Sequence, residues 1–163
     1  MQGMTTAESS PRLKLSELAP QVYSAMGRLH ATAEKAAQEA GLEHSLLELI
    51  KIRASQINGC AFCIDMHTLD ARAAGEGEQR LYALSAWEET PFFTARERAA
   101  LALTEAVTLI HTGHVPDDVY RAALKEFSEA EVAQVIWAAA VINAYNRIAI
   151  STRMVPGNHT PKA

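Results

Sequence analysis

One short pattern stands before each of two segments with helical spacing in the second half of the chain. The pattern is Ser or Thr followed three residues later by Glu, in TARE (94–97) and SEAE (128–131). Such a capping box satisfies backbone N–H groups at the start of a helix. The segments that follow, 97–111 and 131–152, have apolar residues at helical intervals. They predict two helices, and the second is apolar on most faces, as expected of a central helix or one buried between subunits.

The rest of the chain carries the same helical punctuation. Pro20 favours a helix start and Gly41 a helix end. Asn58-Gly59 and Gly75 end the next two segments. No stretch alternates with period two, and no hairpin signal separates two apolar runs. Further helical segments are 43–57, 60–74, 77–87 and 116–127.

These segments predict an all-α fold, a compact bundle of six to seven helices. With 163 residues, the chain is long enough to bury a core as one domain. We expect a flexible N-terminal segment at 1–15, a single helical domain at 16–155, and a flexible tail at 156–163.

Composition excludes several classes of protein. The net charge is −4 and lysine and arginine form no block, which argues against nucleic-acid binding. No apolar run reaches the roughly 18–20 residues that span a bilayer, so no membrane association is expected. The N-terminus lacks the basic and apolar regions of a signal peptide. We therefore expect a cytoplasmic protein, in which a permanent disulfide would be unusual.

Both cysteines of the chain lie in NGCAFCIDMH (58–67). Cys60 and Cys63 are three residues apart and His67 follows Cys63 by four, so on a helix all three share one face. With Asn58 as the N-cap, the thiols stand in the first turns of a helix. The helix dipole and a nearby imidazole there are expected to lower the thiol pKa values. Such a pair is suited to redox chemistry, and no βαβ pattern supports a thioredoxin-like fold for it.

Four spaced residues carry a resemblance to a known family. Glu48, then Cys60-x-x-Cys63 after eleven residues, then His67 after three more, resembles the signature of the alkylhydroperoxidase D group. That group belongs to the all-helical carboxymuconolactone decarboxylase superfamily. The segments ERAALALTEAV (97–107) and NAYNRIAI (143–150) are also similar to that family. The resemblance covers about residues 20–155.

The resemblance implies a role for each of these positions. Cys63 matches the peroxidatic thiol and Cys60 the resolving thiol, while Glu48 and His67 match a proton relay that works partly through water. Helix position alone would favour Cys60 as the more acidic thiol. We assign the attack to Cys63, because the adjacent His67 can also manage protons during O–O cleavage. The alkylhydroperoxidase D proteins carry a histidine where this chain has Phe62, which points to a related branch.

Two other interpretations of the cysteines stay open. They can be inert, because free cysteine is commonly a small buried hydrophobe. They can also bind zinc together with His67 and Glu48, although ligands on one helical stripe fit a tetrahedron poorly. Asp65 and Asp70, on the same segment, are expected to face solvent.

The leading hypothesis is a thiol-dependent peroxidase that reduces alkyl hydroperoxides or hydrogen peroxide through a Cys60–Cys63 disulfide. It needs no bound cofactor or metal. Its partners would be an external dithiol reductant, dihydrolipoamide or a thioredoxin-like protein, and further copies of the chain in a homo-oligomer, a trimer or hexamer as in the family. The alternatives are a non-peroxidatic dithiol oxidoreductase or redox-responsive module and, less favoured, a decarboxylase-type enzyme.

Overall fold

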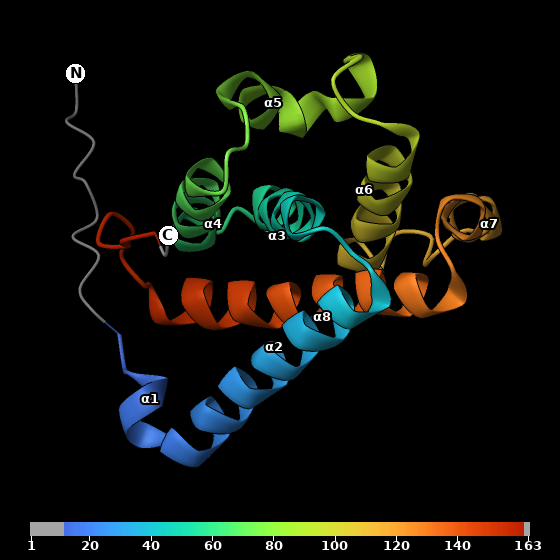
Figure 1. The fold of residues 1–163 in the computed structure, drawn as a ribbon. Coiled ribbons are helices and arrows are strands. Elements are labelled where there is room, and N and C mark those ends of the chain that lie inside the picture. The colour runs from blue at the N-terminus through green and yellow to red at the C-terminus, as the bar shows by residue number, and fades with distance from the viewer. Residues whose placement is uncertain (1–11, 162–163) are drawn as a thin grey trace.

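The computed structural model describes residues 12–161, and all of the regular structure in that range is helical. Eight α-helices and one 3-10 helix follow one another along the described chain, which confirms the all-α fold (Figure 1). In order they are α1 (Leu15–Leu18), α2 (Pro20–Ala40), α3 (His44–Asn58), α4 (Ala61–Ala73), α5 (Glu78–Ala83), η1 (Leu84–Glu89), α6 (Ala95–Thr108), α7 (Asp117–Glu126) and α8 (Glu129–Thr152).

Local signals set most of the helix ends. Both predicted capping boxes form, at the starts of α6 and α8. Pro20 occupies the first turn of α2, and Gly41 ends that helix with a φ of 101°, a left-handed conformation that suits glycine. The segment 77–87, expected as one helix, is divided: α5 ends at Ala83 and η1 follows, and within η1 Ala86 leaves helical geometry.

The core lies around α3, which packs against α4, α6 and α8. Its side chains are buried on nearly every face, including Leu49, Ile50 and Ile52 at 0% exposure. The long α8 contacts α2, α3, α4, α6 and α7, as the prediction of a central helix requires. In Figure 1, α2 crosses α8 diagonally, with α3 and α4 above α8. Side chains from α2, α3, α4 and α8 line one cavity between these helices.

The terminal segments are described in part. Residues 1–11 of the predicted lead-in and 162–163 of the predicted tail lie outside the described range, and flexibility of either end stays a prediction. Within the described tail, the backbone N–H of Gly157 donates to Asp65 Oδ2 (2.8 Å), and His159 pairs with Asp70 (2.7 Å). Both aspartates are half-buried beneath this segment, so the expectation that they face solvent is wrong. No helix between residues 12 and 161 is long and apolar enough to cross a membrane.

Candidate active site

The junction of α3 and α4 positions the two thiols. Gly59 ends α3 in a left-handed conformation, with a φ of 69°, and Cys60 then becomes the N-cap of α4. Cys60 Sγ accepts a hydrogen bond from the backbone N–H of Cys63 (3.4 Å). The expectation that Asn58 caps α4 is wrong, because Asn58 is still the last residue of α3.

The two sulfur atoms lie next to each other in an apolar environment. Cys60 Sγ is 2.7 Å from Cys63 Sγ, both residues are 1% exposed, and both thiols are free. Little movement would be needed for a bond to form between them. The buried side chains that share this cluster are Ala54, Ile142 and Ala149, with the partly buried Phe62 and Tyr145 packed against it.

Burial controls the acidity of Cys63. It raises the pKa of this thiol from an ordinary 9.0 to about 12, the hydrogen bond with Cys60 adds to the increase, and a hydrogen bond from Asn146 opposes it. That increase corresponds to about 4 kcal/mol, whereas a helix N-terminus contributes about 0.3–1 kcal/mol. The expectation of a lowered pKa is therefore wrong for Cys63, because desolvation outweighs the dipole.

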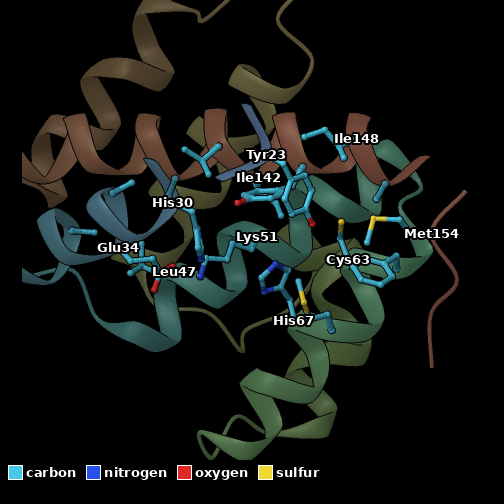
Figure 2. A pocket seen from close by; sticks show the side chains of 18 residues that line it. Tyr23, His30, Glu34, Leu47, Lys51, Cys63, His67, Ile142, Ile148 and Met154 are labelled. Carbon is cyan, nitrogen blue, oxygen red and sulfur yellow. Dashed lines mark ion pairs between the residues drawn. The ribbon is translucent and has the colours of Figure 1, made fainter. Parts of the chain in front are cut away.

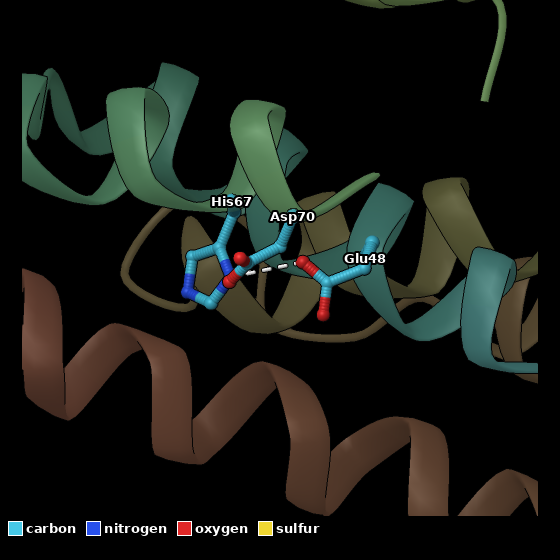
Figure 3. A group of neighbouring side chains, drawn as sticks. All are labelled: Glu48, His67 and Asp70. Atoms are coloured by element: carbon cyan, nitrogen blue, oxygen red, sulfur yellow. Dashed lines mark hydrogen bonds and ion pairs between the residues drawn. The ribbon is translucent and has the colours of Figure 1, made fainter. Parts of the chain in front are cut away.

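His67 and Glu48 form a buried pair beside the thiols. His67 Nδ1 lies 3.0 Å from Glu48 Oε2, and the two residues are 6% and 3% exposed (Figure 3). Because a carboxylate only accepts hydrogen bonds, Nδ1 carries the proton of this contact, and in the neutral ring the lone pair is then on Nε2. This arrangement equips His67 to act as a base through Nε2.

The pair continues into charges that the sequence analysis missed. Lys51 Nζ lies 2.8 Å from Glu48 Oε1 and also pairs with Glu34 of α2. Burial alone would raise the pKa of Glu48, but the His67 hydrogen bond and the Lys51 charge lower it to about 2. Glu48 is thus an anion over the physiological range. The spacing of Glu48 and Lys51 on α3 is typical of an ion pair. A lysine in an apolar segment is nevertheless usually expected to be exposed to solvent.

The side chains of Cys63 and His67 open onto one cavity of about 320 Å³. Of the two cysteines, only Cys63 is among the lining residues, together with His67. Figure 2 shows Cys63 and Met154 toward one end, His30 and Glu34 toward the other, and His67 between them. The remaining wall is mostly apolar and includes Leu47, Met66, Val141, Ile142 and Ile148.

A buried amide network lies behind the thiols. Asn58 Nδ2 donates to Asn143 Oδ1 (2.9 Å) and Asn146 Oδ1 (2.8 Å), and Asn146 Nδ2 donates to Ser55 Oγ (3.0 Å). Asn146 is 0% exposed and is the residue that opposes the high pKa of Cys63. Asn146 is not among the residues predicted for the site, although two asparagines three residues apart in an apolar helix are a signal of a buried polar contact.

The zinc interpretation finds a different set of neighbours. Within the described residues, the one group of three possible ligand atoms lying within 4.8 Å of one another belongs to Glu48, His67 and Asp70 (Figure 3). It contains no cysteine, so the proposed set of two thiols, His67 and Glu48 does not converge. The carboxylates of this group already pair with Lys51 and His159.

The all-helical fold is that of AhpD-like proteins. Consistent with this, the model of the carboxymuconolactone decarboxylase family matches residues 20–106, and the chain belongs to that family. It is 43% identical over 142 residues to the uncharacterized protein YdfG of Bacillus subtilis (strain 168), covering 87% of this chain and 94% of YdfG.

Solved structures agree with this assignment. A protein of unknown function from Agrobacterium tumefaciens, described as a putative antioxidant defence protein AhpD, superposes with a TM-score of 0.84 and 38% identity, over 92% of this chain and all of that one. The debrominase Bmp8, solved in complex with 2,3,4-tribromopyrrole, has a TM-score of 0.74 at 15% identity, over 96% of this chain and 95% of its own. At that identity Bmp8 supports the fold alone.

Proposed function

We propose that this protein is a thiol-dependent peroxidase that reduces organic hydroperoxides or hydrogen peroxide through a Cys60–Cys63 disulfide. One observation carries the proposal. Cys63 and His67 line the same cavity, while Cys60 Sγ lies 2.7 Å from Cys63 Sγ and outside the lining. A peroxide in the cavity would thus meet one thiol, with the second thiol placed to resolve the product.

The proposed cycle has three steps. Cys63 sulfur attacks the terminal peroxide oxygen, the O–O bond breaks, and the alcohol or water leaves with the thiol proton, so that Cys63 becomes a sulfenic acid. Cys60 sulfur then displaces the hydroxyl as water and forms the disulfide. An external dithiol restores both thiols by exchange and is itself oxidised to a disulfide.

The relay supplies what Cys63 lacks. With its pKa raised to about 12, the thiol is almost fully protonated at neutral pH. We assign to His67 Nε2 the removal of this proton and its delivery to the leaving oxygen, with Glu48 holding the opposite side of the ring. Because the proton is transferred during the attack, no thiolate needs to be present beforehand.

Burial favours small or slender reactants. Both cysteines are 1% exposed, so the dithiol of a folded protein would not reach them, whereas a small peroxide in the cavity would reach Cys63. The apolar wall favours organic hydroperoxides, and a dithiol on a narrow arm, such as dihydrolipoamide, fits this access better than a thioredoxin-like protein.

Exposed apolar side chains on α8, Trp137 and Ile150, are consistent with a homo-oligomer, a trimer or hexamer.

Intact-mass spectrometry with alkylation tests the proposal. After one equivalent of cumene hydroperoxide, we expect a loss of two hydrogens, both thiols blocked to alkylation, and recovery with dihydrolipoamide. Cys60→Ser should accumulate a sulfenic acid on Cys63. Unchanged mass with both thiols alkylatable would refute the peroxidase, and a sulfenic acid on Cys60 in Cys63→Ser would refute the assigned roles.

The same variants separate the alternatives. A general dithiol oxidoreductase would form the disulfide with a disulfide reagent but consume peroxide no faster than Cys63→Ser does. Lactone or decarboxylation chemistry would survive the loss of both cysteines.

A further inference from the structure

A buried ammonium group stands behind the proposed relay. Lys51 is 6% exposed and lies on α3 between Glu48 of the same helix and Glu34 of α2. Burying such charges is costly, and replacing a buried ion pair by apolar residues is often neutral or stabilising. Fold stability is therefore a weak reason for this lysine, and its contacts suggest a more specific one.

Lys51 and His67 each contact a different oxygen of the Glu48 carboxylate. Lys51 binds Oε1 at 2.8 Å and His67 Nδ1 binds Oε2 at 3.0 Å. The ammonium favours the anionic form of Glu48, and it opposes a second positive charge on the imidazole. Both effects favour one state of the pair, a carboxylate beside a neutral His67 that is protonated on Nδ1.

The other charges around the pair act in the opposite direction. Glu34 from α2 and Asp70 from α4 add negative charge. Asp70 lies in the same 4.8 Å group as Glu48 and His67, and it also pairs with His159 of the C-terminal segment. His30 from α2 is no substitute cation, because burial and then the charge of Lys51 lower its pKa. The α8 wall of the cavity adds apolar side chains and the phenol of Tyr145. Without Lys51, carboxylates surround the imidazole and draw a proton onto it.

We propose that Lys51 is a positioning residue that keeps His67 neutral, with its proton on Nδ1 and Nε2 free toward the cavity. As a role in peroxide reduction, this inference rests on the proposed function. As a statement about the protonation of His67, it stands independently of any substrate.

The pH profile of Lys51→Met tests this role. We expect the midpoint of the acid limb of kcat/KM for cumene hydroperoxide to move up by about one pH unit, so that activity falls by up to about tenfold at pH values below the wild-type midpoint and recovers toward wild type at pH 9. Lys51→Arg keeps the charge and should retain the wild-type profile. Lys35→Met on α2 removes an exposed lysine paired with Glu39 and is the matched control.

Nitrogen NMR of His67 gives a readout that does not need activity. Along a pH titration we expect His67 Nε2 to lose its proton about one pH unit higher in Lys51→Met than in the wild type, with Nδ1 protonated in both. If the wild type consumes no peroxide, this measurement still decides the role of Lys51 while the proposed function fails.

Glu34→Gln provides a second variant with the opposite sign. It removes negative charge while leaving the Lys51–Glu48 contact, so the acid limb should move to lower pH. The inference is overturned by a Lys51→Met profile with an unchanged midpoint, even at lower overall activity, or by a His67 Nε2 that loses its proton at the same pH in that variant as in the wild type. If Lys51→Met does not fold, an upward shift in Glu34→Gln overturns it instead.

Discussion

The thiol pair and the neighbouring Glu48–Lys51 pair of the proposed site are buried to a similar degree. The thiols are uncharged, whereas the Glu48–Lys51 pair is ionised. Around Cys60 and Cys63 the contacts are apolar or amide groups, and burial raises the pKa of Cys63 to about 12. Next to His67, which lines the same cavity as Cys63, Glu48 is ionised beside Lys51, with its pKa lowered to about 2. Burial alone therefore does not set the charge of a group. The partners do, and Cys63 has no cationic partner among the described residues.

The largest expected effect comes from the thiol side. Cys63→Ser should lower peroxide consumption by about 1000-fold or more, because the nucleophile is lost. Cys60→Ser should consume about one equivalent of peroxide and then stop, because the sulfenic acid is not resolved. Stopped-flow peroxide consumption distinguishes a single turnover from no turnover, and sustained turnover in Cys63→Ser would contradict the assignment.

The next effect comes from the relay side. His67→Gln should lower kcat/KM by about 100-fold at pH 7, within the usual range for general acid–base catalysis. If Cys63 is as protonated as its surroundings require, raising the pH toward 10 should restore part of this loss in His67→Gln. A loss that stays constant from pH 7 to 10 would mean that His67 does not act through the thiol proton.

Acid stability sharpens the same contrast. The pKa of Glu48 is lower in the folded than in the unfolded protein, so its contribution is present above about pH 4.5 and is lost as pH falls toward 2. The change amounts to about 3 kcal/mol in the free energy of unfolding. Urea unfolding at several pH values should show this dependence reduced in Glu48→Gln. Glu39→Gln, an exposed carboxylate on α2, should retain the wild-type dependence.

Asn146 allows a smaller and more selective test. Asn146→Leu removes the hydrogen bond that opposes the high pKa of Cys63, so iodoacetamide should alkylate Cys63 about tenfold more slowly at a given pH. Asn143→Leu also breaks the amide network, since Asn143 binds Asn58 and Thr108, and is the matched control. Both variants should lose about 1–3 kcal/mol of stability, but only Asn146→Leu should slow alkylation. Equal alkylation rates in the two variants would mean that Asn146 does not lower the pKa of Cys63.

Local and long-range features of this protein differ in how well the sequence predicts them. Capping boxes and glycine ends act within one helical turn, so the all-α fold and most helix boundaries follow directly from the residues. The N-cap of α4 differs from the prediction because Gly59 ends α3 one residue after Asn58, and Cys60 is then the first residue able to cap.

The errors at the site share one origin in packing. Helix position suggests a lowered thiol pKa, but Ile142 and Ala149 of α8 bury Cys63 from a distance of about 80 residues along the chain. Lys51 is buried because Glu34 reaches it from another helix. Periodicity reports which face of a helix is apolar, but not which polar group on a neighbouring helix will meet it.

The dependence of the site on α8 has a consequence for synthesis. When the ribosome has made Cys60 and Cys63, about 80 residues remain before Ile142, Asn146 and Ala149 exist to enclose them. At about 5–20 residues per second, that interval is roughly 4–16 s. During it the nascent thiols are solvated and have neither their apolar cover nor the Asn146 contact. The surroundings that set the reactivity of the two thiols are thus complete only when α8 docks. Oxidation of the pair during synthesis would act on solvated thiols, not on buried ones.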